Sequence, residues 1–415
     1  MRKRSHISEK STPNPARGFR GISARQWKIL LVLTSINLLN YFDRLLVVPM
    51  FPMLKRQFHI SDFQLGLLAS AVLLVDCVTA LAAGYWSDRG PRKKIMAGGV
   101  FVWSAATFLS GLAPTFGALL GTRAVVGVGE GAYAPGGTAI ITASFPARLR
   151  ARVQSVFSLG SVVGGVLGLA AGGVLAERIG WRHSFMLVGL PGALIGIAIL
   201  RLPAPAPKPQ EEAHPSWGLL KIATYDAVLG GGLLAAFSGA VFINWSPTFV
   251  TRYHHMSIGQ ASELLAPLVL ASSVIGVLLG GYLADRLQEH WPWGRTLTVG
   301  AAMLVATPFL YLAVETKSTI MFFVCIFAAS GSLAAYYGPT TAIIHDLTPR
   351  HAHAFAFGLY MFVIHFFGDA MAPAMVGFLS EVFNLRRALL LGVATNFFSA
   401  LCFLAAAWLI RRRPA

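Results

Sequence analysis

Long apolar stretches, interrupted by short polar segments and by Gly and Pro, recur along the chain from Trp27 to Ile410. Several of them exceed the roughly 18 apolar residues expected of a membrane-spanning helix. This pattern predicts an all-α integral membrane protein with twelve transmembrane helices in two six-helix halves. The predicted spans are 27–50, 63–86, 95–113, 116–143, 152–176, 183–201, 219–250, 262–284, 296–314, 318–344, 354–379 and 386–410.

One polar gap is longer than the others and separates the first six predicted spans from the last six. Residues 202–218 are rich in Pro and contain two Glu, which predicts an extended, exposed cytoplasmic linker. The predicted organisation is a basic N-terminal tail (1–26), a six-helix half (27–201), the linker, a second six-helix half (219–410) and a basic C-terminal tail (411–415). We expect the chain to work as a monomer.

The composition excludes most other classes of protein. Hydrophobic residues make up 55% of the chain and charged residues only 12%, whereas soluble domains carry about 25% charged residues. Ordinary soluble enzymes, disulfide scaffolds and disordered chains do not fit. The three cysteines, Cys77, Cys325 and Cys402, lie in apolar stretches without disulfide or metal-site spacing.

The net charge of +17 would indicate a nucleic-acid partner in a soluble protein. Here its distribution matters more, because cytoplasmic loops of membrane proteins accumulate Lys and Arg. With the N-terminus inside, 24 of the 34 Lys and Arg fall in inner segments. We therefore expect both termini in the cytoplasm, the lipid bilayer as partner, and no nucleic acid.

A short motif occurs twice, 197 residues apart. The stretch from Gly84 to Asp88 and Arg89 ends the second predicted span, and the stretch from Gly281 to Asp285 and Arg286 ends the eighth. One such motif would be weak, because Asp and Arg are common at helix ends. Two copies at equivalent positions indicate that the halves are repeats of one another.

With Arg92 and Lys93, the first copy resembles the cytoplasmic loop motif of the major facilitator superfamily of secondary transporters. Pro91 stands where many members have Gly. The resemblance implies a conformational latch, which positive charge on the inner side alone would also explain. The latch residues it implies are Gly84, Asp88, Arg89, Arg92, Asp285 and Arg286.

Four further stretches resemble the Spinster-like transporters within that superfamily. They are Asn40–Arg44, Arg123–Pro135, Gly180–Arg182 and His365–Pro373. The resemblance covers nearly the whole chain from about residue 27. It implies transport of a lysophospholipid or sphingoid phosphate, coupled to protons in some members.

Charged residues inside a membrane are costly and usually mark pathways or relays. The clear cases are Asp43, Arg44, Asp76, Arg123, Glu130 and Asp369. At 1.5 Å per residue, Asp43 and Arg123 both lie roughly 10 Å below the outer surface, so they can pair. Glu130 lies about two turns deeper than Arg123 on nearly the same face.

We expect Asp43 and Glu130 to carry protons, with Arg44 and Arg123 as their switching partners. Either arginine can also hold an anionic head group, because guanidinium matches phosphate geometry. The alternative is that these residues are static ion pairs that fix helix packing. Asp76 departs from the Spinster-like pattern and has three readings: a proton site, a cation site, or a structural partner of Arg44.

Candidate substrate-binding residues come from both halves. His365 and Asp369 are four residues apart and share a helix face, as a proton relay or as a structural polar pair. Aromatic side chains add an apolar wall, although many aromatics on membrane helices face lipid. The full substrate-binding set is Arg44, Arg123, Tyr133, Trp245, Tyr336, Tyr337, Phe362, His365, Phe366 and Asp369.

One charged wall and one aromatic wall favour an amphipathic substrate. We expect a secondary transporter of a lysophospholipid or related lipid, working by alternating access and coupled to protons, in a bacterial inner membrane. The alternatives are a proton-coupled small organic anion symporter and a hydrophobic drug efflux transporter. No P-loop, H-E-x-x-H or G-x-S-x-G occurs, so we expect no enzyme, no metal and no cofactor other than protons.

Overall fold

The computed structural model describes residues 22–203, 217–349 and 352–412, and every regular element in these ranges is helical. The all-α membrane fold predicted from the sequence is confirmed. Most of the predicted tails (1–26 and 411–415) and of the linker (202–218) lies outside the described residues. In the first half the helices are α1 (Ala24–Leu46), η1 (Val48–Met50), α2 (Phe51–Phe58), α3 (Asp62–Arg89), α4 (Arg92–Leu112), α5 (Phe116–Ser144) and α6 (Ala147–Leu200).

The elements of the second half are given for the described residues 217–349 and 352–412. They are η2 (Trp217–Lys221), α7 (Ala223–Tyr253), α8 (Ile258–His290), α9 (Gly294–Glu315), α10 (Thr319–Ala334), α11 (Tyr337–Leu347), α12 (His353–Val363), η4 (Ile364–Asp369), α13 (Ala372–Val382) and α14 (Leu385–Arg411). Several helices begin at sequence signals that fix their ends. Ser23, Ser61 and Ser257 each form a capping box with a Gln three residues later.

Ten helices of the described chain are long and apolar enough to cross a membrane. One of these candidates, Val153–Leu200, has 48 residues, about twice the length of one crossing. It contains Gly180 at φ +80°, a left-handed conformation that reverses the chain at the predicted boundary between two spans. Helix α5 is not among the ten candidates. The count of twelve spans therefore stays a prediction.

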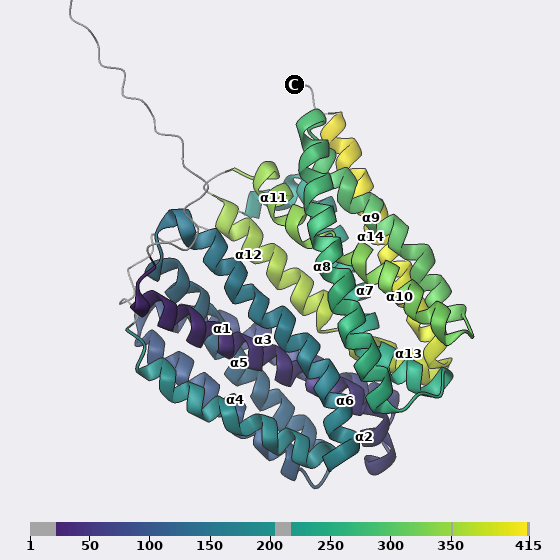
Figure 1. Cartoon of the computed structure of the whole chain (residues 1–415). Coiled ribbons are helices and arrows are strands. Elements are labelled where there is room, and N and C mark those ends of the chain that lie inside the picture. The colour runs from purple at the N-terminus through teal and green to yellow at the C-terminus, as the bar shows by residue number, and fades with distance from the viewer. Residues whose placement is uncertain (1–21, 204–216, 350–351, 413–415) are drawn as a thin grey trace, which may run out of the picture.

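The helices α1–α6 form one bundle and α7–α14 the other, purple to teal and green to yellow in Figure 1. In the first bundle α6 packs along α1. Gly160, Gly164, Gly168 and Gly172 line this contact, and a Cβ at any of them would collide with α1. A spacing of four residues places small residues on one face and lets two helices approach closely.

The two bundles meet where α3 packs against α13 and where α6 packs against α8. We call the end of the molecule that carries Ala24 and Arg411 the cytoplasmic end, following the predicted topology, and the opposite end the outer end. The beginnings of α3 and α8 lie at the outer end. The halves are therefore joined most closely there.

Candidate functional site

Two neighbouring residues of α1, Asp43 and Arg44, bond to different partners on the surrounding helices. The guanidinium of Arg123 on α5 donates to both carboxylate oxygens of Asp43, at 3.2 and 3.3 Å. Thr107 on α4 donates its hydroxyl to the same carboxylate at 2.7 Å. Asp43 and Arg123 have no exposed surface. This pair is sealed within the first bundle, so in this conformation Arg123 does not present itself to a head group.

Arg44 bridges two carboxylates on two other helices. Its Nη2 lies 2.5 Å from Oε2 of Glu130 on α5 and 3.2 Å from Oδ2 of Asp76 on α3. Arg44 and Asp76 are partly exposed, whereas Glu130 is buried. The second oxygen of Glu130 is also buried and has no hydrogen-bond partner among the described residues. The contact between Asp76 and Arg44, one of the three alternatives predicted for Asp76, is present. The proton-site and cation-site alternatives stay predictions.

The pairing is crossed, because each residue of the α1 pair reaches a different level of α5. Asp43 contacts Arg123, and Arg44 contacts Glu130 seven residues further along α5. Both ion pairs therefore join α1 to α5. The roles of carriers and switching partners stay predictions.

In the second half, the predicted pair on the eleventh span lies on a π-helical turn, η4. His365 Nδ1 lies 2.6 Å from Oδ2 of Asp369, and both side chains are partly exposed. Such π-turns occur frequently at functional sites because they interrupt the regular helix ladder. The turn η4 packs against α3 of the first half and α7 of the second. The turn that carries the pair therefore contacts both halves.

Four of the predicted aromatic residues form two ring pairs. The rings of Tyr336 and Tyr337 lie 4.3 Å apart, and those of Phe362 and Phe366 stack at 5.4 Å. Tyr337 is 63% exposed, whereas Tyr336 is buried. The second pair includes Phe366 of η4 and supplies apolar surface on the turn that carries Asp369.

Two other predicted substrate-binding residues belong to the packed core instead. Tyr133 is buried, and its hydroxyl donates to the carbonyl of Leu33 at 2.9 Å. Trp245 is also buried; its indole N–H donates to the carbonyl of Pro373 at 3.1 Å, and its ring packs against Phe51. The sequence shows that these positions are aromatic but not which way they point. In this conformation the two side chains hold helices together, and their role in substrate binding stays a prediction.

A second polar cluster lies at the outer end and joins the two halves. Asp62, at the first turn of α3, is buried. Arg252 of α7 donates to both of its oxygens at 2.6 Å, and Ser380 of α13 and Lys55 of α2 each donate to it at 2.6 Å. We call these four residues the outer clasp. Buried carboxylates of this kind need several donors to compensate their lost hydration.

The backbone around the clasp is tightly packed. The N–H of Phe63 donates to Glu381 at 2.6 Å, and the N–H of Ala374 donates to Ser70 at 3.2 Å. A Cβ at Gly66 or Gly377 would collide with the backbone of the opposite half. The clasp is absent from the sequence predictions, because Asp62 and Arg252 read there as ordinary charges at span ends. Their one signal is that an acidic residue directly follows the N-cap Ser61, a few residues after the basic pair Lys55 and Arg56.

The predicted latch lies at the cytoplasmic end and is only partly described. The side chain of Asp88 lies outside the described residues. Arg89 lies over the ring of Tyr85 at 4.0 Å, and Arg92 is buried. A Cβ at Gly84 would meet nothing closer than 3.8 Å. The expectation that Gly84 permits a close helix approach is therefore wrong for this conformation.

The second copy of the motif forms bonds within its own half. Arg295, at the beginning of α9, donates to Asp285 at 2.9 Å and to Asp346 at 2.8 Å. Arg286 donates to the hydroxyl of Tyr282 at 2.7 Å. Arg295 was missed in the sequence because it lies beyond the repeated motif.

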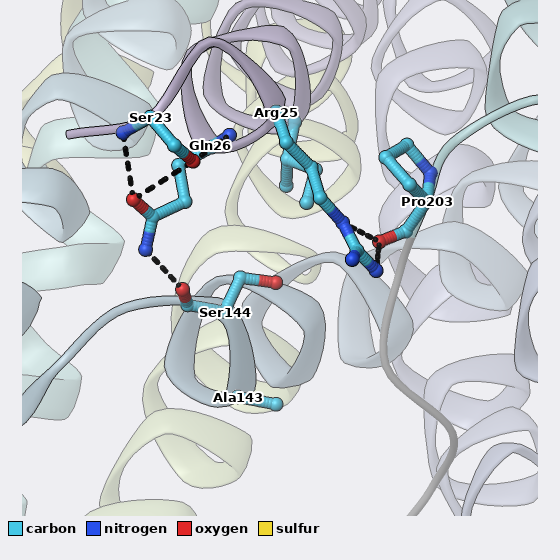
Figure 2. Close-up of a pocket in the computed structure, with 7 residues that line it drawn as sticks. Ser23, Arg25, Gln26, Ala143, Ser144 and Pro203 are labelled. Atoms are coloured by element: carbon cyan, nitrogen blue, oxygen red, sulfur yellow. Dashed lines mark hydrogen bonds between the residues drawn. The ribbon is translucent and has the colours of Figure 1, made fainter.

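A small polar pocket at the cytoplasmic end shows how the first half holds the beginning of the linker (Figure 2). The guanidinium of Arg25 donates to the carbonyl of Pro203 at 2.9 and 2.5 Å, and Gln26 donates to the carbonyl of Ser144 at 2.7 Å. Lys93 donates to the carbonyl of Leu202 at 2.9 Å. Cations at a helix C-terminus satisfy its free carbonyls. Like the latch contacts, these bonds stay within one half.

Comparisons with known proteins agree with this architecture. The sequence profile of the Major Facilitator Superfamily matches residues 33–368. An MFS-type efflux pump of Mycolicibacterium smegmatis is 29% identical over 407 residues, covering 94% of this chain and 93% of the pump. Protein spinster homolog 1 of Homo sapiens is 28% identical over 393 residues, covering 86% of this chain and 73% of the relative.

A solved structure is also similar over nearly the whole chain. It is a bacterial homolog of the human lysosomal transporter Spinster in an inward-facing and occupied conformation. The TM-score is 0.83 at 25% identity, with 95% of this chain and 100% of that chain covered. The resemblance to Spinster-like transporters that the sequence predicted is confirmed.

Proposed function

The chain belongs to the Major Facilitator Superfamily, and we propose that it moves a lysophospholipid or related amphipathic lipid across the membrane by alternating access, coupled to protons. Transport and a multi-pass membrane location follow from the family. The lipid substrate and the proton coupling are the proposal.

The crossed ion pairs of α1 and α5 carry the coupling part of this proposal. Asp43 is held by Arg123, and Glu130 is held by Arg44. A carboxylate that loses its arginine in a dry environment binds a proton, and one that regains it releases the proton. Movement of α1 against α5 would therefore exchange a proton between the two sides of the membrane.

The lipid part rests on the contrast between the halves and on the relatives. Charged groups lie on α1, α3 and α5, whereas the second half supplies two pairs of aromatic rings, one of them at η4. A polar head beside the charges and an acyl tail beside the rings would use both. Several relatives are Spinster homologues, and the similar structure is of a bacterial Spinster homolog.

A transport assay tests both parts. Purified protein in proteoliposomes would be given labelled lysophospholipid with and without an imposed pH gradient, beside Asp43→Asn and Glu130→Gln. We expect a gradient-stimulated movement that both variants lose. Movement that ignores the gradient and survives both substitutions would keep the lipid and remove the carrier roles. No movement of any lysophospholipid would contradict the lipid assignment.

Efflux of a hydrophobic drug is the second candidate, because the M. smegmatis relative is an efflux pump and matches 94% of this chain. The same vesicles loaded with a hydrophobic dye distinguish the two functions. A small organic anion symporter is less favoured, because the predicted binding residues of the second half are mostly aromatic rings rather than cationic groups. We further propose a monomer in a bacterial inner membrane with both termini in the cytoplasm, using protons and no other cofactor.

A further inference from the structure

Two donors of unequal quality hold the carboxylate of Asp43. The hydroxyl of Thr107 on α4 donates to Oδ2 at 2.7 Å, within the range of about 2.5–2.7 Å for a hydroxyl bonded to a charged oxygen. The Nη1 of Arg123 donates to Oδ1 at 3.2 Å and to Oδ2 at 3.3 Å, whereas close charged pairs measure about 2.7–2.9 Å. The shortest bond of this carboxylate is therefore the one from Thr107.

The guanidinium of Arg123 is incompletely bonded. It reaches both carboxylate oxygens through one nitrogen, without the two-nitrogen fork of the strongest arginine–carboxylate pairs. Its Nη2 donates to the backbone carbonyl of Asp43 at 3.4 Å, and its Nε is buried without a hydrogen-bond partner among the described residues. Arg123 is therefore the less firmly held of the two donors and the one that can leave the carboxylate more easily.

Burial makes the hydroxyl of Thr107 important for the charge state of Asp43. The side chains of Thr107, Asp43 and Arg123 have no exposed surface. A hydrogen bond to the charged form of a buried group favours that form. Thr107 therefore stabilises the ionised carboxylate independently of Arg123. The other proposed carrier differs, because Oε1 of Glu130 has no hydrogen-bond partner in the described part of the chain.

The elements around Asp43 bring few other charges to this level of the bundle. Helix α4 contributes the neutral Thr107, and α6 contributes the ring of Phe185, whose centre lies 5.6 Å from the guanidinium carbon of Arg123. Arg182 of α6 donates instead to carbonyls at the end of α4. The charged side chains come from α1, α3 and α5 and form the ion pairs already described: Arg44, Asp76, Arg123 and Glu130.

We propose that Thr107 is a positioning residue for proton exchange at Asp43. Its hydroxyl holds Oδ2, so Oδ1 is the oxygen that exchanges its contact with Arg123 for a proton. When Arg123 withdraws, a proton binds to Oδ1 and neutralises the carboxylate, while Arg123 keeps its own charge. When Arg123 returns, the proton leaves. This inference rests on the proposed proton coupling and assigns one more residue to it.

The test compares variants of the full chain that lack or keep the hydroxyl. Thr107→Val and Thr107→Ala remove it, and Thr107→Ser keeps it. The first readout is the pH dependence of lysophosphatidylcholine movement in proteoliposomes. The second is a pH titration of the purified protein, followed by the infrared carbonyl stretch of the protonated Asp43 carboxyl. This band is assigned by its loss in Asp43→Asn and requires no substrate.

We expect the pH midpoint of both readouts to rise by about one unit in Thr107→Val and in Thr107→Ala. The hydroxyl favours the charged carboxylate, so the carboxylate without it binds its proton at a higher pH. One unit corresponds to a tenfold change in proton affinity, about the loss expected for one hydrogen bond to a charged group. Thr107→Ser should titrate like the wild type.

The matched control is Ser110→Ala, which removes another buried hydroxyl from α4. Ser110 donates to the carbonyl of Ala106 and to the hydroxyl of Thr122, both at 2.9 Å. Its loss disturbs the packing of the same helix without removing a donor from Asp43. Both midpoints should therefore stay at the wild-type value.

The outcomes separate the role of Thr107 from the proposed function. Unchanged midpoints in both variants without the hydroxyl, or an equal shift in Ser110→Ala, overturn the positioning role and leave proton coupling standing. If the wild type moves no lysophosphatidylcholine, the lipid assignment fails, and the infrared titration alone supports the role by a shift or overturns it by none. If Asp43 stays ionised at every pH in all variants, its carrier role and the role of Thr107 are both overturned.

Discussion

The outer and cytoplasmic ends of the molecule hold the two halves in opposite ways. At the outer end, Asp62 of the first half binds Arg252 and Ser380 of the second. At the cytoplasmic end, Arg25 donates to the carbonyl of Pro203 and Arg295 donates to Asp285, and each of these bonds stays within one half. Direct bonds between the halves therefore close the outer end in the described conformation. The similar Spinster homolog structure is inward-facing.

The largest effect is expected from breaking the outer clasp. Asp62→Asn leaves Arg252 without its carboxylate, at a cost of about 3 kcal/mol, the low end for a buried pair because Arg252 is partly exposed. Such a change shifts a two-state equilibrium about a hundredfold. Spin labels at Gly117, in the first turn of α5, and at Lys317, between α9 and α10, should therefore report longer distances across the outer end.

The matched control for that experiment is Asp285→Asn, which removes an exposed carboxylate bonded within one half. It should leave the outer distance unchanged. Equal distances in wild type and Asp62→Asn would show that the outer end is closed by packing alone.

A smaller effect is expected from adding one methyl group at each end. Gly66→Ala places a Cβ against the backbone of Pro373 in the opposite half, and overpacking of this kind costs about 1–3 kcal/mol. Gly281→Ala, in the second copy of the latch motif, meets open space. The melting temperature in detergent should fall for Gly66→Ala and stay within error of wild type for Gly281→Ala. A larger loss of thermal stability for Gly281→Ala than for Gly66→Ala would contradict this, because it would show that the tighter packing lies at the cytoplasmic end.

The smallest effect is expected from the cytoplasmic ion pairs of the second half. Arg295→Gln breaks bonds to Asp285 and Asp346, whose side chains are 70% and 49% exposed. Exposed pairs contribute about 0–1 kcal/mol. The melting temperature and the distance between the halves should both stay near wild type. A shift toward the outward-open state would instead show that these pairs communicate with the interface.

The sequence predicts the helical architecture well because apolar length and glycine spacing act locally. The glycines from Gly160 to Gly172 are spaced four residues apart, which favours a close helix contact on that face. Helix α1 lies against this face. The pairing of Asp43 with Arg123 also follows from depth alone, because both lie near the same level on neighbouring helices. The first span is different: the chain continues helically through η1 and α2 to Phe58, past the predicted end at 50.

Side-chain direction and long-range partners are not readable from the sequence. Tyr133 and Trp245 look like pocket residues because they are aromatic, yet each donates a hydrogen bond to a distant backbone carbonyl in the core. Asp62 looks like a surface charge, yet its partner Arg252 is 190 residues away. Asp62 meets Ser380 where α3 packs against α13, and Arg252 reaches the same carboxylate from α7.

Proton-driven alternating access is tested most directly by measuring the distance between the two halves at both ends of one protein as a function of pH. Spin pairs would sit at Gly117 and Lys317 for the outer end and at Lys94 and Glu289 for the cytoplasmic end, in a chain without its native cysteines. If protonation of Asp43 and Glu130 drives alternating access, lowering the pH should change the two distances in opposite directions, and Asp43→Asn with Glu130→Gln should abolish the response. Distances that ignore pH, or a response that survives both substitutions, would contradict proton-driven switching.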